Sequence, residues 1–230
     1  LTGLSLGADV KIRATGSYQN GSSGLVQQVY PAVGIGSLAT LAVGTTTAWL
    51  GATATVDDVL AVVTKRGFVY APTASNSNPL IGGTGVTKVT VVGNTGAYTS
   101  SLRGLAASTG YSYKAYVESS EGTRYTSTAS FTTLNVPTDI TLSPASLAEN
   151  SPANTTIGTL SATDADVGQT HTFSLVSGTG NTDNASFTID GSALKLNLSA
   201  DFETKNSYSL RVLTDDGAGG VFAKVLAVTI

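Results

Sequence analysis

The chain has 230 residues with 26 glycines, no cysteine and no methionine, and only 12% of its residues are charged. This composition excludes disulfides and thiolate metal sites. It also lacks the basic stripe that nucleic-acid binding needs and any apolar run near the roughly 20 residues of a membrane-spanning helix. No segment has a sustained helical apolar pattern, so we predict an all-β chain, long enough for two sandwich domains of about 100 residues each.

Charge is divided unevenly between the two halves of the chain. Residues 1–134 contain eight Lys and Arg against five Asp and Glu, a net charge of +3, whereas residues 135–230 contain four against ten, a net charge of −6. In the second half the carboxylates gather in segments between short alternating runs rich in Val, Leu and Thr. Carboxylates that cluster on loops favour cation binding. A solvated, solubilising surface is the plainer alternative.

The first element predicted along the chain is a strand over residues 4–14. Apolar and polar side chains alternate there, with the period of a strand that has one buried face; the apolar set is Leu4, Leu6, Ala8, Val10, Ile12 and Ala14. Residues 16–24, GSYQNGSSG, are typical of a flexible connector. A single strand cannot bury its apolar face alone. It therefore pairs within its own chain, is the last strand of a preceding domain, or is donated to a neighbouring copy, which would build a homo-oligomer or a fibre.

Trp49 is the aromatic residue that does not fit a buried position. In TTTAWLGATATV the strand phase that buries Leu50 also buries the nearby alanines, which turns Trp49 outward. A large apolar side chain on an outer face often marks a contact. We expect a subunit interface, a cover formed by the N-terminal segment or a loop, or a sugar-stacking surface if Tyr70 or Tyr98 shares its face.

The middle of the chain carries a first family resemblance. The segments VTKRGFVYAPT and NPLIGGTGVTKVTV, followed by LAASTGYSYKAYV and RYTSTASFTT, resemble the fibronectin type III domains of bacterial surface proteins over residues 25–134. Leu105 precedes Tyr111 by six residues, which is the spacing of a tyrosine corner. The resemblance implies about seven strands in two sheets that serve as a scaffold.

A second resemblance covers residues 135–230 and is carried by five short motifs in order. These are NVP with Asn135, LAEN with Glu149, ATDADVG with Asp164 and Asp166, ADFET with Asp201 and Glu203, and LTDDGAGG with Asp215. The pattern resembles the cadherin repeat in its bacterial form. A cadherin-like domain implies Ca2+ as the bound cofactor.

The resemblance also implies where calcium would bind. The pole facing the linker would use Asp164, Asp166 and Asp215 with Asn135, and the opposite pole would use Glu149, Asp201 and Glu203. Leu134 stands where the family usually has an aspartate, so the first of these sites is short of one ligand. We expect it to be weak, with a Kd of about 10⁻⁴–10⁻³ M as in extracellular modules.

Enzymatic function is not expected from this sequence. His171, the only histidine, lies in the alternating run THTFSLV and is predicted to be a strand-surface residue. The chain has no G-x-S-x-G motif, and one histidine without cysteine cannot fill a typical zinc site.

We therefore predict two tandem Greek-key β-sandwiches, fibronectin type III-like over 25–134 and cadherin-like over 135–230, preceded by an extra strand within residues 1–24. The predicted function is that of a non-catalytic extracellular protein of the bacterial cell surface, adhesive or structural, and a fibre subunit if the N-terminal strand is donated. A surface protein or a glycan would be its receptor. The alternatives are a spacer in a long modular adhesin and an accessory module of a secreted polysaccharide-degrading enzyme.

Overall fold

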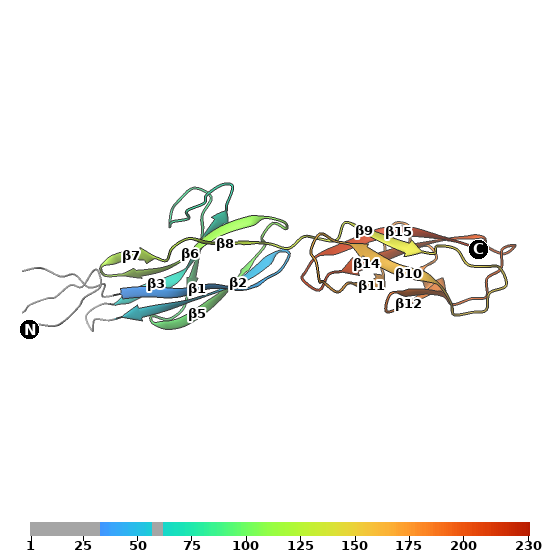
Figure 1. Cartoon of the computed structure of the whole chain (residues 1–230), viewed down its shortest axis with the longest axis horizontal. Coiled ribbons are helices and arrows are strands. Elements are labelled where there is room, and N and C mark those ends of the chain that lie inside the picture. The colour runs from blue at the N-terminus through green and yellow to red at the C-terminus, as the bar shows by residue number, and fades with distance from the viewer. Residues whose placement is uncertain (1–32, 57–61) are drawn as a thin grey trace, which may run out of the picture. The chain divides into compact units, whose positions relative to one another are not determined.

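The computed structural model describes residues 33–56 and 62–230. Over these residues the regular structure is β-strand, and the only helical element is a 3-10 turn, η1 (Asn184–Ser186) (Figure 1). The all-β prediction is confirmed for this part of the chain. The strand predicted over residues 4–14 and the connector over 16–24 lie outside the described residues.

The described residues fall into two compact units. The first contains Ala48–Leu102 and Gly110–Phe131 together with most of β1 (Val33–Val43), and the second contains Thr132–Ile230 with two loop segments, Val43–Thr47 and Arg103–Thr109. The predicted domain limits at 25–134 and 135–230 stay a prediction in their exact position.

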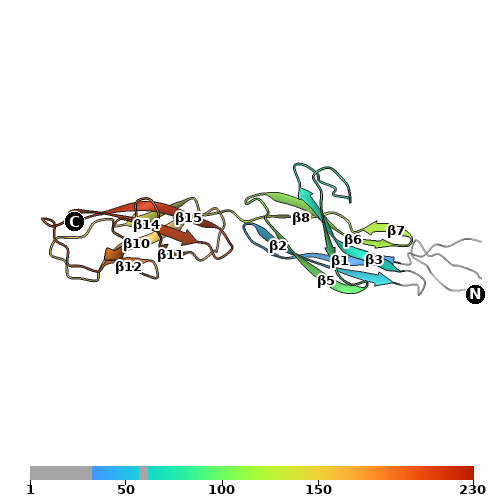
Figure 2. The ribbon, with the colours of Figure 1, turned by 180° about the vertical axis from the view of Figure 1, so that it is seen from behind.

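Two sheets form the first unit (Figures 1 and 2). One has the order β1-β2-β5, in which β2 is Thr47–Val56 and β5 is Gly96–Arg103. The other has the order β4-β3-β6-β7, in which β3 is Val63–Pro72, β4 is Thr87–Val91, β6 is Gly110–Ser119 and β7 is Gly122–Tyr125; β8 (Ala129–Thr132) also pairs with β6.

Aromatic side chains fill the space between these two sheets. The rings of Phe68 and Tyr98, one from each sheet, lie 5.2 Å apart, and Tyr113 packs 5.7 Å from Phe131. The buried Tyr113 hydroxyl is 2.7 Å from Thr40 Oγ1 on the opposite sheet. Buried tyrosines are tolerated when the hydroxyl has such a partner. The hydrogen bond also shows that Thr40 faces the core.

Arg66 is a buried arginine that holds the turn between β4 and β5. Its Nη1 donates to the carbonyls of Thr95 (2.6 Å) and Gly96 (3.1 Å), and Nη2 donates to Val92 O (3.1 Å). The guanidinium also lies 4.8 Å from the centre of the Tyr98 ring. A buried charge needs several hydrogen bonds to replace water, and here backbone carbonyls supply them.

The predicted tyrosine corner falls between β5 and β6. Leu105 and Tyr111 are both buried, and Leu105 N donates to Thr46 O at 3.0 Å. These positions fit a scaffold role. The corner itself, like the fibronectin resemblance, stays a prediction.

Two further sheets form the second unit. One has the order β12-β13-β10-β9, with β9 at Asp139–Ser143, β10 at Thr155–Thr163, β12 at Phe187–Asp190 and β13 at Ala193–Leu196. The other has the order β11-β14-β15, with β11 at Thr172–Leu175, β14 at Ser207–Asp215 and β15 at Val221–Thr229.

The core of this unit lies between its two sheets. Alternate residues of β14 are buried, as the period of a strand with one solvated face requires. The Phe187 ring from one sheet meets the Tyr208 ring from the other edge-on at 5.5 Å. The fully buried members of the core include Leu194, Leu196, Leu210 and Val212. The acidic loops are left at the two ends of the strands, where side chains remain available for chemistry.

Candidate calcium sites

The distal end of the second unit brings two acidic segments together. Glu149 follows β9, while Asp201 and Glu203 lie between β13 and β14. Reciprocal backbone hydrogen bonds join the segments, because Asn150 N donates to Ala200 O and Ala200 N donates to Ser151 O, each at 2.9 Å. The buried Ala200 side chain anchors this contact in the core. The backbone therefore fixes the position of the carboxylates on both sides.

The three carboxylates at the distal end, Glu149, Asp201 and Glu203, differ in what they contact. Glu203 raises the pKa of Glu149, chiefly through a side-chain hydrogen bond and then through its charge, with a smaller contribution from the charge of Asp201. A hydrogen bond from the Phe202 backbone acts in the opposite direction on this pKa but does not cancel the rise. Asp201 instead caps its own turn, since its carboxylate accepts from Thr204 N (3.0 Å) and Thr204 Oγ1 (2.7 Å). These bonds hold the pKa of Asp201 below its ordinary value. The pair of glutamates is thus left with like charges in contact, which a cation would relieve.

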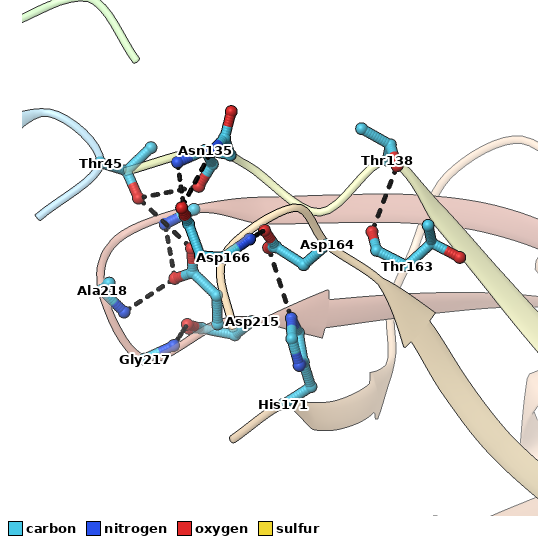
Figure 3. A network of polar contacts seen from close by, with 12 residues as sticks. Thr45, Asn135, Thr138, Thr163, Asp164, Asp166, His171, Asp215, Gly217 and Ala218 are labelled. Carbon is cyan, nitrogen blue, oxygen red and sulfur yellow. Dashed lines mark hydrogen bonds and ion pairs between the residues drawn. The ribbon is translucent and has the colours of Figure 1, made fainter. Parts of the chain in front are cut away.

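At the other end of the unit the acidic residues form a chain of hydrogen bonds (Figure 3). Asn135 donates to both oxygens of Asp166, from its backbone N to Oδ2 at 2.6 Å and from Nδ2 to Oδ1 at 2.8 Å. The backbone N of Asp166 in turn donates to Asp164 Oδ1 at 2.9 Å. The predicted ligands Asn135, Asp164 and Asp166 are therefore brought together, with each carboxylate oxygen of Asp166 already accepting an N–H.

His171 joins this chain, and its predicted position was wrong. It precedes β11 instead of lying on a strand surface, its side chain is only 16% exposed, and its Nε2 lies 3.4 Å from Asp164 Oδ2. The Asp164 side chain is itself 2% exposed. The alternating run in the sequence concealed this contact, because a loop turn places the ring beside a carboxylate seven residues earlier.

Asp215 and Asp216 differ in what they contact. Asp215 pairs with Thr172 across the sheet and accepts from Gly217 N at 2.8 Å. Asp216 is 4% exposed, and its Oδ1 accepts from Ala218 N (2.7 Å) and Gly220 N (2.8 Å). Within the same compact unit, Thr45 Oγ1 donates to its other oxygen at 3.3 Å. Asp216 was not among the predicted site residues, although a second aspartate directly before Gly217 is typical of a loop-closing residue.

These ends differ in how well their residues fit a calcium ion. Over residues 33–56 and 62–230, no group of three or more His, Asp or Glu side chains is placed so that it could hold a metal ion. Calcium, however, also takes backbone carbonyls, amide oxygens and water among its six to eight ligands. The glutamate pair at the distal end fits this requirement better, because like charges are held beside each other there and the net effect on Glu149 is a raised pKa.

Trp49 has the orientation that the sequence predicts. Its side chain is 46% exposed, whereas Ala48 and Leu50 on either side are fully buried. The sugar-stacking alternative loses its support, since Tyr98 is buried in the core and Tyr70 belongs to the other sheet. A role for Trp49 in an interface stays a prediction, and the other interface residues, Leu4, Leu6, Ala8, Val10 and Ile12, lie outside the described residues.

The comparison with protein families assigns the second unit. Residues 143–230 match the family described as Cadherin domain. Cadherin domains are typically extracellular, commonly bind Ca2+ and are non-catalytic. No curated protein matches the sequence. Among the helical elements of the described residues, none is long and apolar enough to cross a membrane.

Solved structures give weaker likenesses. The sensor domain of the anti-sigma factor RsgI4 from Pseudobacteroides cellulosolvens is 16% identical, with a TM-score of 0.35, over 46% of this chain and 98% of that one. The third cadherin domain of human protocadherin 7 is 21% identical, with a TM-score of 0.33, over 46% of this chain and 93% of that one. Cadherin domains 3–6 of protocadherin gamma B2 are 16% identical, with a TM-score of 0.35, over 86% of this chain and 50% of that one.

Proposed function

We propose that this chain is a non-catalytic extracellular protein of a bacterial surface, adhesive or structural in role, whose second unit is stabilised by calcium. The observation that carries the proposal is the pair of backbone hydrogen bonds that joins the segment of Glu149 to the segment of Asp201 and Glu203, where the neighbouring like charges raise the pKa of Glu149. Two carboxylates that these backbone hydrogen bonds hold close together destabilise the native state unless a cation or a proton lies between them. The cadherin match of residues 143–230 supports calcium as that cation.

Binding at the distal end would use the two glutamates as its anionic ligands. Asp201 lies beside them, and its carboxylate can accept a cation contact in addition to the bonds from Thr204, because each carboxylate oxygen has two lone pairs. Backbone carbonyls and water would complete the shell. The ion would replace the repulsion between the Glu149 and Glu203 carboxylates with the attraction of each carboxylate for the cation.

A second and weaker site is proposed at the other end, among Asn135, Asp164, Asp166 and Asp215. Calcium there would compete with the Asn135 donors for the oxygens of Asp166 and with His171 for Asp164. Leu134 offers no carboxylate to offset that competition. We expect this site to fill only at calcium concentrations near the weak limit of extracellular modules, about 10⁻³ M.

We further propose that the first unit is a fibronectin type III-like scaffold and that copies assemble through residues 4–14. The two-sheet arrangement and the buried aromatic core support the scaffold role. Assembly is supported by the alternating apolar residues Leu4, Leu6, Ala8, Val10 and Ile12, which a lone strand cannot bury.

The calcium proposal is tested by thermal unfolding of the purified chain in 10 mM calcium, in 10 mM magnesium and in chelator. Because a ligand that binds the native state must stabilise it, calcium should raise the Tm of the second unit by roughly 10 °C if its Kd is near 10⁻⁴ M. Magnesium, which demands tighter octahedral geometry, should raise it less.

The matched variants are Glu203→Gln and Asp190→Asn. Both remove one carboxylate from the same unit, but Asp190 is an exposed partner of Lys195 away from the glutamate pair. Glu203→Gln should abolish most of the calcium shift, and Asp190→Asn should retain it. A wild-type Tm that is the same in calcium and chelator would refute the proposal.

A further inference from the structure

We propose that the free edge of β1 is the docking surface that accepts residues 4–14 of a neighbouring copy, as an added strand of the β1-β2-β5 sheet. The inference rests on the assembly proposed above and names the surface that assembly would use. Its occupant is defined by sequence: an alternating apolar segment of 11 residues, matched in length to the 11 residues of β1.

The edge of β1 has no partner within the described part of the chain. In the order β1-β2-β5 the strand pairs with β2 on one side only. Its other side presents a row of backbone N–H and C=O groups, which is a template for another strand. At 11 residues β1 is also the longest strand of the described chain.

This edge lacks the charged side chains that the other edges carry, and its backbone departs from extended geometry at Ser37, where φ is 52°. Natural edge strands are blunted by charged side chains, proline or coverage. Of the described edge strands with five or more residues, the others each contain a charged residue: Lys88 in β4, Arg103 in β5, Asp139 in β9 and Lys224 in β15. The sequence of β1, VGIGSLATLAV, contains neither a charge nor a proline. An unprotected edge of this kind indicates a surface that is covered when the protein functions.

Burial points to the same side of the molecule. In β2 the core-facing residues are almost fully buried, but in β1 only Val33 is buried. Thr40 faces the core through its bond to Tyr113, and Leu38, two residues earlier and thus on the same face, remains partly exposed. The core is therefore open beside β1. An added strand that turns Leu6 and Val10 inward would close it.

The donor segment, residues 4–14, has one apolar face and one polar face, as a strand added beside β1 would need. Its apolar face would continue the core past Leu38, and its other face, which includes Asp9, Lys11 and Arg13, would point to solvent. Backbone pairing would supply affinity, and the alternating side chains would set the register. The 18 residues between this segment and Val33 span at most about 60 Å when fully extended, which is long enough to reach a neighbouring copy.

Cysteine cross-linking of the full chain tests the surface, because the wild type contains no cysteine. The acceptor variant is Ala39→Cys, which lies between the core-facing positions and therefore on the outer face of β1. Donor variants are Gly7→Cys, Asp9→Cys and Lys11→Cys, on the polar face of the segment, so that one of them comes within the 7 Å Cα separation that a disulfide needs. The control acceptor is Thr99→Cys, exposed on β5 at the other edge of the same sheet.

Donor and acceptor variants are purified separately, mixed and oxidised, and the disulfide-linked dimer is measured on a non-reducing gel. We expect at least one donor to cross-link to Ala39→Cys with a yield ten times higher than to Thr99→Cys. Equal yields, or no cross-link to Ala39→Cys from an assembled protein, would overturn the β1 surface while leaving the proposed assembly standing. A wild type that stays monomeric at high concentration, or a cross-link that forms only within a single chain carrying both cysteines, would overturn the assembly and the surface together.

Discussion

The two ends of the second unit carry acidic motifs of similar density but use them differently. At one end Asp166 and Asp216 each receive two or more N–H or O–H donors from nearby groups. At the other end Glu149 and Glu203 meet each other, and the contact raises the pKa of Glu149. Spacing alone therefore does not identify a cation site. A carboxylate that is already satisfied by donors stabilises the loop, whereas one held against its like remains available to a metal.

The largest expected effect comes from Glu149→Gln. The change in Tm that this substitution causes should have opposite signs in chelator and in calcium. In chelator the variant removes a like-charge contact, so the Tm should rise by a few degrees. In 10 mM calcium it removes a ligand, so the Tm should fall below that of the wild type by roughly 5 °C or more, which is the lost calcium shift less the few degrees gained in chelator. Thermal unfolding in both media measures the reversal, and a shift of the same sign in both would mean that the glutamate pair does not bind calcium.

The pH dependence in chelator follows from the same contact. Because the folded pKa of Glu149 is raised above its ordinary 4.5, the native state binds the proton more tightly than the unfolded state. The contribution of Glu149 to stability is therefore largest below pH 4.5 and is lost as the pH rises through the folded pKa. The difference in Tm between wild type and Glu149→Gln should change in that window, and in saturating calcium the trend should invert because the ion binds the deprotonated form.

Asp166→Asn tests the end of the second unit where N–H groups already donate to the carboxylates. The change removes the charge that accepts both Asn135 bonds, and hydrogen bonds to charged groups contribute about 1.5–3 kcal/mol. We expect a loss of about 2 kcal/mol in the free energy of unfolding, nearly equal in chelator and in 1 mM calcium. A loss that appears only in calcium would show that the ion, and not the Asn135 donors, is the main partner of Asp166.

The smallest effect is expected in the first unit, where Glu118→Gln removes the 2.6 Å pair with Lys88. Lys88 lowers the pKa of Glu118, so the stabilisation is present above pH 4.5 and disappears as the pH falls through the lowered folded pKa. Partly exposed pairs contribute about 0.2–1 kcal/mol. Denaturant unfolding at pH 7 and pH 3 measures the difference, which should be the same with and without calcium; a calcium-dependent difference would place a cation in the first unit as well.

How far the sequence predicts the molecule depends on the physical origin of each feature. The outward orientation of Trp49 follows from the period of two, which the backbone imposes on any strand, and the structure confirms it. The contact between Glu149 and Glu203 joins segments more than 50 residues apart and was reached only through the family resemblance. His171 and Asp216 were not predicted, because their partners depend on loop conformations that no periodicity encodes. The role of residues 4–14 stays a prediction.

The hydrogen bonds from Arg66 to the backbone of the turn between β4 and β5 determine where this turn can be engineered. A Cβ at Gly93 would lie 2.5 Å from Arg66 Nη2, so no side chain fits there without displacing the guanidinium from its carbonyls. One residue earlier, Val92 is 94% exposed. A side chain or label introduced at Val92 would therefore be displayed on a rigid support, because Arg66 holds the carbonyl of that residue and not its side chain, whereas a side chain one position later would break that support.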